Sequence, residues 1–78
     1  MKRIKEHDRI VLTCDLPEQG LKQGDVGTVV HVHARQRAFE VEFLTLGGET
    51  VGIATLLPSQ VRAVGKREIT HARSLAER

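Results

Sequence analysis

The feature that most constrains this chain is a pair of neighbouring segments, 26–33 and 38–44, whose side chains favour strands. In residues 38–44 (AFEVEFL), Phe39, Val41 and Phe43 occupy alternate positions, and glutamates stand between them. Residues 26–33 (VGTVVHVH) are rich in β-branched side chains. Successive side chains of a strand point to opposite faces, so both segments are predicted to be strands with one buried face.

The four residues between these segments, 34–37, set the register of the predicted hairpin. A loop of this length places Val32 opposite Phe39 and Val30 opposite Val41 on the buried side, and it leaves His31 on the solvent side. We therefore predict one dry interior shared by Val30, Val32, Phe39, Val41 and Phe43.

The rest of the chain supplies three further strands, at residues 8–13, 50–56 and 61–64. Residues 14–25 contain a proline and two glycines and are predicted to form a long loop, anchored by Leu16 and Leu21. A Gly-Gly turn precedes residues 50–56 and pairs Phe43 with Gly52. Val51 and Ile53 then fall on the face opposite Phe43 unless a bulge near Gly48 or Gly52 corrects the register or the strand bends, and the sequence leaves both alternatives open.

The order of elements is a strand, a long loop, a three-strand meander, a single helical turn at residues 58–60 and a short last strand. This order is typical of a five-stranded Src-homology-3-like (SH3-like) barrel, and we assign that all-β fold to residues 1–64. Residues 65–78 form a basic tail in which Ile69, Ala72, Leu75 and Ala76 have helical spacing. We expect a short C-terminal helix that docks on the barrel or on a partner, or else frays, because it is too short to be stable alone.

Charge is distributed unevenly along the 78 residues. Residues 8–64 carry five basic and seven acidic side chains, a net charge of −2, whereas residues 1–7 and 65–78 contribute +2 each. Cys14 is the single cysteine, so an intramolecular disulfide is excluded and a reducing compartment fits. With no signal-peptide pattern and no membrane-length apolar run, we expect a cytoplasmic location and no membrane association.

Two resemblances enter through the loop and the strand that follows it. Residues 24–30 (GDVGTVV) resemble the glycine-centred motif of KOW domains, which occur in transcription-elongation factors and ribosomal proteins. Over residues 8–64, the strings DLPEQGLKQGDVGTVVHV, EVEF, GGETV and SQVRAV resemble a family of short bacterial domains of unknown function. The barrel of that family is similar to the one ending the β-subunit of nitrile hydratase. The resemblance implies an SH3-like barrel and assigns no catalytic residue.

Two groups of charged residues are candidate interaction surfaces. Asp15, Glu18 and Asp25 belong, with Asp8, to an acidic set around the long loop that would suit a basic partner. The alternative is ordinary turn chemistry, in which Asp side chains accept hydrogen bonds from their own loop. Arg35 and Arg37 lie in the predicted hairpin loop, where they could meet phosphate.

Catalytic and metal chemistry find little support in the sequence. His31 and His33 share one strand face, and Glu40 is predicted to lie opposite His31, but no further ligand cluster accompanies them, so an exposed histidine–glutamate contact is the preferred interpretation. Nothing places a base beside Cys14, which we expect to be a small packed side chain. Phosphate-binding glycine motifs are absent. We therefore predict no catalytic residue, no metal site and no cofactor.

These observations favour a non-catalytic binding module whose partner is a protein, with self-association through the tail as a further expectation. The alternative is an RNA- or ribosome-associated module, as the KOW resemblance implies. RNA binding usually uses exposed aromatic side chains, whereas this chain has no Trp or Tyr and both of its Phe residues are predicted to be buried.

Overall fold

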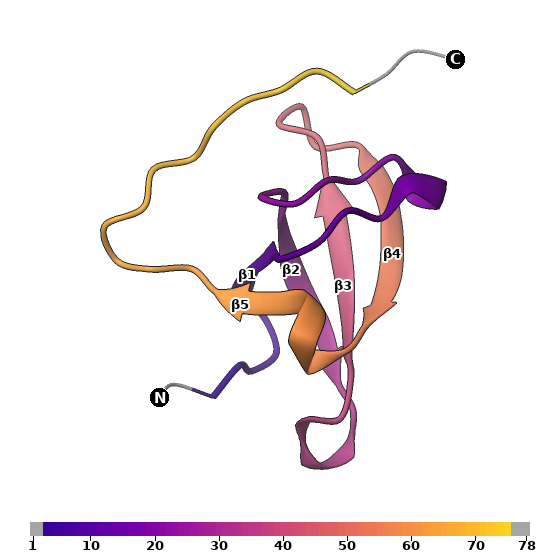
Figure 1. Ribbon diagram of the computed structural model, residues 1–78, viewed down its shortest axis with the longest axis vertical. Helices are drawn as coiled ribbons and strands as arrows, with labels where there is room; N and C mark the ends of the chain where they lie inside the picture. The colour runs from indigo at the N-terminus through magenta and orange to yellow at the C-terminus, as the bar shows by residue number, and fades with distance from the viewer. Residues whose placement is uncertain (1–2, 76–78) are drawn as a thin grey trace.

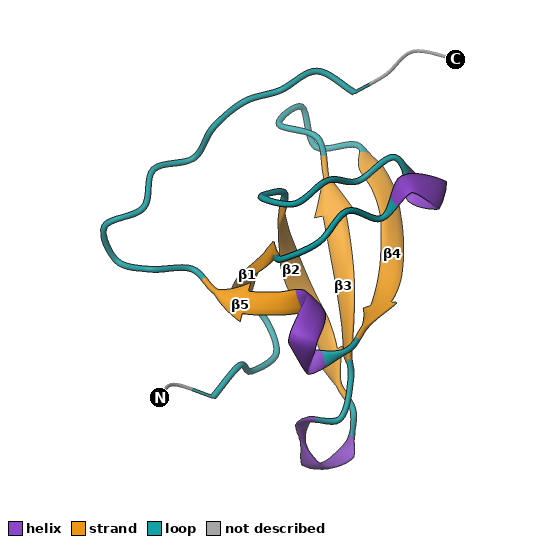
Figure 2. Cartoon of the chain, in the orientation of Figure 1, coloured by secondary structure: helices purple, strands orange, loops and turns teal. Residues whose placement is uncertain are grey.

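The computed structural model describes residues 3–75 as five antiparallel strands and three single turns of 3₁₀ helix (Figures 1 and 2). The strands are β1 (Arg9–Leu12), β2 (Val26–Val32), β3 (Phe39–Leu44), β4 (Thr50–Leu56) and β5 (Val61–Ala63). The 3₁₀ turns are η1 (Pro17–Gln19), η2 (Ala34–Gln36) and η3 (Pro58–Gln60). The predicted all-β class and all five predicted strands are confirmed, as is the turn before β5.

The strands form one sheet in the order β4-β3-β2-β1-β5. In Figure 1, β5 lies across the others, and η3 turns the chain from β4 into it. The sheet is strongly curled (Figure 1). Within the described residues β5 pairs only with β1, so hydrogen bonds do not close the sheet into a barrel. The fold is therefore a curled five-stranded antiparallel sheet.

The concave side of the sheet holds the hydrophobic core. Its buried members come from all five strands and from the long loop, and they are Ile10, Leu12, Leu21, Val29, Phe39, Val41, Phe43, Ala54, Leu56 and Val61. Leu16 forms an isolated bridge with Leu21 and packs at the edge of this core, as predicted. A loop anchored by two leucines keeps the polar residues between them at the surface.

The predicted hairpin register is confirmed at its turn and wrong further along β2. Val32 pairs with Phe39 and His31 pairs with Glu40, but Val41 pairs with Val29 rather than with Val30. The register shifts between Val29 and His31, as happens when one strand carries an extra residue in a bulge. Val30 is consequently 41% exposed, and Val29 takes its place in the interior with no exposed surface.

A second irregularity resolves the register of β4. Phe43 pairs with Gly52 as predicted, and the shift lies between Phe43 and Leu44, which pairs with Thr50. Val51 has no partner in this ladder and packs against the core, whereas Ile53 stays exposed. Of the two alternatives, a bulge therefore corrects the register at Val51.

Gly24 and Gly27 have different structural roles in the segment that starts β2. Gly24 has a φ of +96°, a left-handed conformation that side-chain-bearing residues rarely adopt. At Gly27, a Cβ atom would lie 2.5 Å from Val41 Cγ1 and 2.8 Å from Phe43 Cε1. Gly27 thus lets β2 approach the large side chains of β3.

The predicted C-terminal helix is wrong for the described part of the tail. Residues 65–75 form a turn at 66–67 and otherwise have no regular secondary structure, and the chain swings away from the sheet and returns above it (Figure 1). No apolar face is buried to stabilise a helix, since Ile69 is 91% exposed and Leu75 40% exposed. The tail instead docks through a polar contact described below. Ala76, the last residue of the predicted pattern, lies outside the described residues.

Candidate interaction surface

The two ends of the sheet differ in the elements they carry. One end, here the loop end, carries residues 13–25 and the β3–β4 turn at residues 45–49. The opposite end, here the turn end, carries η2 and the rest of the β2–β3 connection, residues 33–38. The predicted site residues divide between them: Asp15, Glu18 and Asp25 lie at the loop end, and Arg35 and Arg37 lie at the turn end.

The aspartates of the long loop stabilise its turns. Asp15 Oδ1 accepts a hydrogen bond of 2.8 Å from the backbone amide of Gln23, and Asp25 Oδ2 accepts one of 2.8 Å from that of Lys22. Asp8 does the same for Lys5 in the N-terminal segment, at 2.9 Å. The turn-chemistry alternative therefore accounts for these three aspartates. Glu18 lies exposed in η1.

Asp25 has an additional partner that the sequence did not reveal, Arg73 of the tail. Arg73 Nε donates to Asp25 Oδ1 at 2.8 Å, and Arg73 Nη2 donates to Oδ2 at 2.5 Å, which is the two-pronged geometry preferred by guanidinium and carboxylate. Nη2 also donates to the carbonyl of Gly20 at 3.2 Å. We call the Asp25 carboxylate and the Gly20 carbonyl the arginine clamp.

The ion pair between Arg73 and the Asp25 carboxylate of the arginine clamp is partly withdrawn from solvent. The exposed fractions of the two side chains are 29% for Arg73 and 18% for Asp25. Burial raises the pKa of the Asp25 carboxyl, but the hydrogen bonds from Arg73 and the Lys22 amide and the charges of both residues outweigh it. The pKa of Asp25 is therefore lowered from its usual value, and the carboxylate is ionised at neutral pH.

A cleft of about 450 Å³ lies at the loop end between the tail and the sheet. One wall is tail residues 70–75, and the other is apolar: Leu21, Val26, Phe43, Leu44, Leu46 and Val51. Several of these apolar side chains reach solvent, since Leu46 is 91% exposed, Leu44 48% and Val26 39%. The arginine clamp lies at its edge, because Asp25 and Arg73 both line it.

The tail is also held where it leaves β5. Arg62 donates from Nη1 and Nη2 to the two carboxylate oxygens of Glu68, at 2.8 and 2.7 Å. The backbone amide of Gly65 donates to Glu68 Oε1 at 2.5 Å. The Arg62 hydrogen bonds, followed by the one from Gly65, lower the pKa of Glu68 to about 2. The tail is thus attached at two points, Glu68 and Arg73.

His31 of β2 and His33, the residue directly after β2, form a polar cluster on the outer face of the sheet. His33 Nε2 lies 2.7 Å from Glu40 Oε2, and the ring centroids of His31 and His33 are 4.9 Å apart. Thr55 donates to both oxygens of Glu40, at 2.9 and 3.0 Å. The His33 hydrogen bond is the main cause of a lowered pKa of Glu40. Between residues 3 and 75, no group of three or more His, Cys, Asp or Glu side chains is arranged to hold a metal ion.

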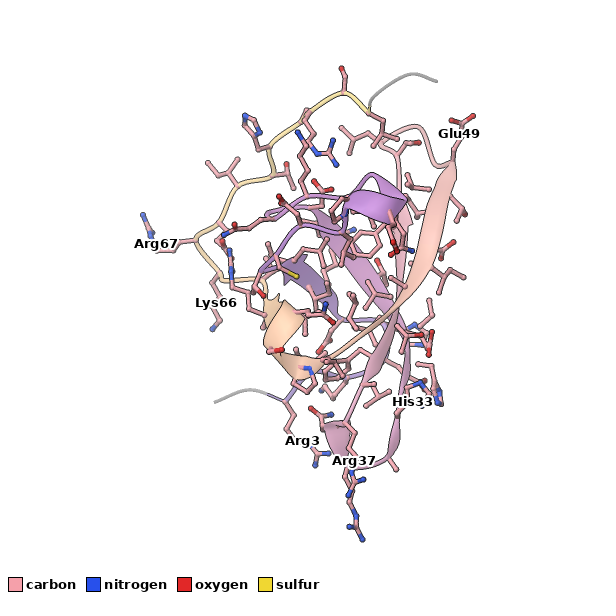
Figure 3. All side chains as sticks on the ribbon, turned by 45° about the vertical axis from the view of Figure 1, so that its right-hand side comes forward. Arg3, His33, Arg37, Glu49, Lys66 and Arg67 are labelled. Atoms are coloured by element: carbon pink, nitrogen blue, oxygen red, sulfur yellow. The ribbon has the colours of Figure 1, made fainter. Side chains whose placement is uncertain are left out.

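The turn end carries basic side chains. Arg35 and Gln36 both have a φ of +61°, and Gln36 Nε2 donates to the carbonyl of Ile4 at 2.7 Å, which ties the N-terminal segment to this end. Arg3 lines a pocket with Gln36, and in the view of Figure 3 both Arg3 and Arg37 lie away from Glu49. The structure therefore does not combine Arg35 and Arg37 with the acidic loop residues into one surface.

Cys14 lies at the end of β1 in a partly buried position. Its sulfur accepts a long contact of 3.8 Å from Gln60 Nε2 of η3. No titratable base is among its described contacts. The placement agrees with a packed side chain between β1 and η3.

Comparisons with known proteins place the sheet, and not the tail, in a family. A family model described as a domain of unknown function (DUF4926) matches residues 6–63, a range that ends with the last residue of β5. No curated protein and no solved structure matches the chain. No helix among the described residues is both long and apolar enough to cross a membrane.

Proposed function

The chain belongs to the DUF4926 family of domains of unknown function, and we propose that it is a non-catalytic module that binds another protein at its loop end. The observation that carries the proposal is the cleft, whose sheet-side wall is apolar and partly exposed. Exposed apolar residues gathered beside polar groups are typical of protein-binding surfaces. The pocket at the turn end is smaller, about 310 Å³, and only two of its lining residues, Ile4 and Val32, are apolar.

We also propose that the curled sheet is an SH3-like barrel related to KOW domains. Its support is the element order, the one-turn helix η3 directly before β5, and the pairing of β5 with β1 across a curled sheet. Small β-folds of this kind present loops on a rigid frame, and those loops are where recognition occurs. The free Cys14 supports a cytoplasmic location.

The polar groups of the cleft support binding over catalysis. A catalytic site needs an acid, base or nucleophile that is free to meet a substrate. Both oxygens of Asp25 are occupied by Arg73 and by the Lys22 amide, and the cleft is open along the tail. Oriented hydrogen-bond acceptors, the Asp25 carboxylate and the Gly20 carbonyl, together with an apolar wall suit a peptide segment of a partner.

A selection experiment tests the proposal. A library of random peptides of about twelve residues is screened against the full chain, and converging sequences are synthesised and titrated. We expect Leu44→Asp, which charges the cleft wall, to weaken binding by about tenfold or more. Leu57→Asp is the matched control, because Leu57 is 57% exposed, close to the 48% of Leu44, and lies outside the cleft. Equal affinity of both variants for the selected peptides would exclude the cleft as the binding surface.

The second candidate function is RNA binding at the turn end, favoured by Arg35 and Arg37 in the β2–β3 connection and by Arg3, which lines a pocket with Gln36 of η2. Its weakness is that Phe39 and Phe43, the only aromatic residues besides histidine, are each 2% exposed, so no Phe ring is available for base stacking. A titration with structured RNA at two salt concentrations separates the two functions. Tight, steeply salt-dependent binding that is lost in the Arg35→Ala/Arg37→Ala double variant would favour the RNA function.

A further inference from the structure

We propose that the arginine clamp is the specificity subsite of the cleft, and that Arg73 of the tail occupies it in place of an arginine from the partner. The preferred partner segment is then an extended peptide in which an arginine is followed, two positions later, by an aliphatic residue. This inference rests on the proposed protein-binding function and adds the chemistry of the partner to it.

The geometry of the clamp selects arginine. The carboxylate oxygens of Asp25 receive two separate N–H groups, from Nε and Nη2, and the Gly20 carbonyl receives a further hydrogen bond from Nη2. A planar guanidinium supplies donors in these directions at once, whereas a lysine ammonium is a compact charge without this fork. Gly20 ends η1 with a φ of +71°, and the Lys22 amide fixes Asp25, so both acceptors belong to ordered turns.

The tail carries the proposed pattern itself. Arg73, Ser74 and Leu75 follow one another in a stretch without helix or turn, and Arg73 and Leu75 both line the cleft. Residues two apart in an extended chain point to the same side, which lets one side chain bind the clamp and the other reach the apolar wall. Charge supports the same occupant, since residues 8–64 carry a net charge of −2 and the tail carries +2.

The described part of the tail can leave the clamp without disturbing the core. All residues from 65 to 75 are exposed, and none of them belongs to the core cluster. The only backbone hydrogen bond within this stretch runs from the Glu68 amide to the Gly65 carbonyl. The cleft between tail and sheet also stays open, so the tail fills the clamp and leaves the apolar wall accessible. A partner peptide that supplies both groups would displace it.

The test uses the full chain carrying Arg73→Ala, which empties the clamp, and a synthetic peptide with the sequence of residues 65–75 as the probe. We expect this variant to bind the probe about tenfold more tightly than the unsubstituted chain, whose own arginine competes. A probe carrying Arg73→Lys should bind about tenfold more weakly, and a probe carrying Arg73→Ala more weakly still. Adding Asp25→Asn to the protein should remove the preference for arginine, while the amide oxygen can still accept from Lys22.

Each contrary result has a distinct meaning. Equal binding of the arginine, lysine and alanine probes, or an arginine preference that survives Asp25→Asn, would overturn the clamp. If the three probes bound equally well but Leu44→Asp abolished their binding, the cleft would still bind peptides, and only the role of the clamp would be wrong. If the unsubstituted chain formed dimers at the concentrations of the titration, and Asp25→Asn abolished them, the occupant would be the tail of a second copy, and the partner-peptide proposal would be wrong.

Discussion

The guanidinium of Arg73 donates to both carboxylate oxygens of Asp25 although the two residues are 48 positions apart. Asp25 is the residue directly before β2, and its own backbone groups bond to Leu12 and Lys22. The contact therefore links the tail to the loop that enters the sheet. It also places the tail beside the apolar wall of the cleft, which is the arrangement from which the proposed function follows.

Gly27→Ala should destabilise the protein although it adds a single methyl group. The new Cβ atom would lie 2.5 Å from Val41 Cγ1 and 2.8 Å from Phe43 Cε1, so the strands must move apart or the core must repack. We expect a loss of about 1–3 kcal/mol in the free energy of unfolding, measured by urea denaturation. Gly47→Ala is the control, because the nearest atom to its Cβ is 3.8 Å away and its effect should be small. Equal unfolding midpoints for the two variants would contradict the close approach at Gly27.

Phe43→Ala should remove much of the stability of so small a domain. Phe43 is 2% exposed and lies in the core cluster, so truncation leaves a cavity and costs about 3–5 kcal/mol. Leu46→Ala, at a position 91% exposed in the β3–β4 turn, should change the free energy of unfolding by about 0.5 kcal/mol or less. Denaturation curves of the two variants check both values, and a mild effect of Phe43→Ala would contradict its place in the core.

The Glu68 carboxyl should titrate at a pKa of about 2, far below the usual value of 4.5. Its two hydrogen bonds from Arg62 favour the ionised form, so its contribution to stability is complete above the unfolded-state pKa and is lost as pH falls toward 2. A carboxyl-carbon NMR titration measures this pKa directly. Arg62→Ala should move it back toward 4.5, whereas an unchanged value in that variant would mean that Arg62 is not the cause.

Arg73→Ala should release the tail and leave the sheet intact. The clamp is the attachment of residues 69–75 to the loop end, and exposed ion pairs contribute about 1 kcal/mol or less to stability. We expect amide relaxation to show faster motion over residues 69–75 and the urea midpoint to change little. Arg67→Ala, which also removes one tail cation, should leave the motion unchanged, and increased motion in both variants would argue against a specific contact at Asp25.

The same contact should weaken in acid. The folded-state pKa of Asp25 is lowered, so the contribution of the clamp is complete above the ordinary pKa of an aspartate and is lost as pH falls through the folded-state value. The tail amides should therefore gain mobility at acid pH before the sheet unfolds. Tail mobility that is constant down to the pH of unfolding would contradict the role of the ionised carboxylate.

The sheet could be predicted because its signals are local. Alternation in β3 placed Phe39, Val41 and Phe43 inside, and the short loop paired Val32 with Phe39. The bulge at Val30 left no such signal. Val29 and Val30 are identical side chains in sequence, so either of them satisfies the pattern.

The tail and the clamp could not be predicted for the opposite reason. Helical spacing of Ile69, Ala72 and Leu75 favoured a helix, yet no partner surface buries that face in the described residues. Asp25 is a candidate from the sequence because it is one of the acidic residues around the long loop. The sequence does not show which of the several basic tail residues is its partner. Only the net charges of −2 and +2 hinted that the tail would return to the sheet.

Binding at the loop end is tested most directly by mapping a bound peptide by amide chemical shifts on the full chain carrying Arg73→Ala. We expect the residue 65–75 peptide to move the amides of Leu21, Asp25, Leu44 and Val51 at the loop end, and to leave those of Arg35 and Arg37 at their free positions. Shifts confined to residues 33–38, or no shifts at saturating peptide, would contradict it.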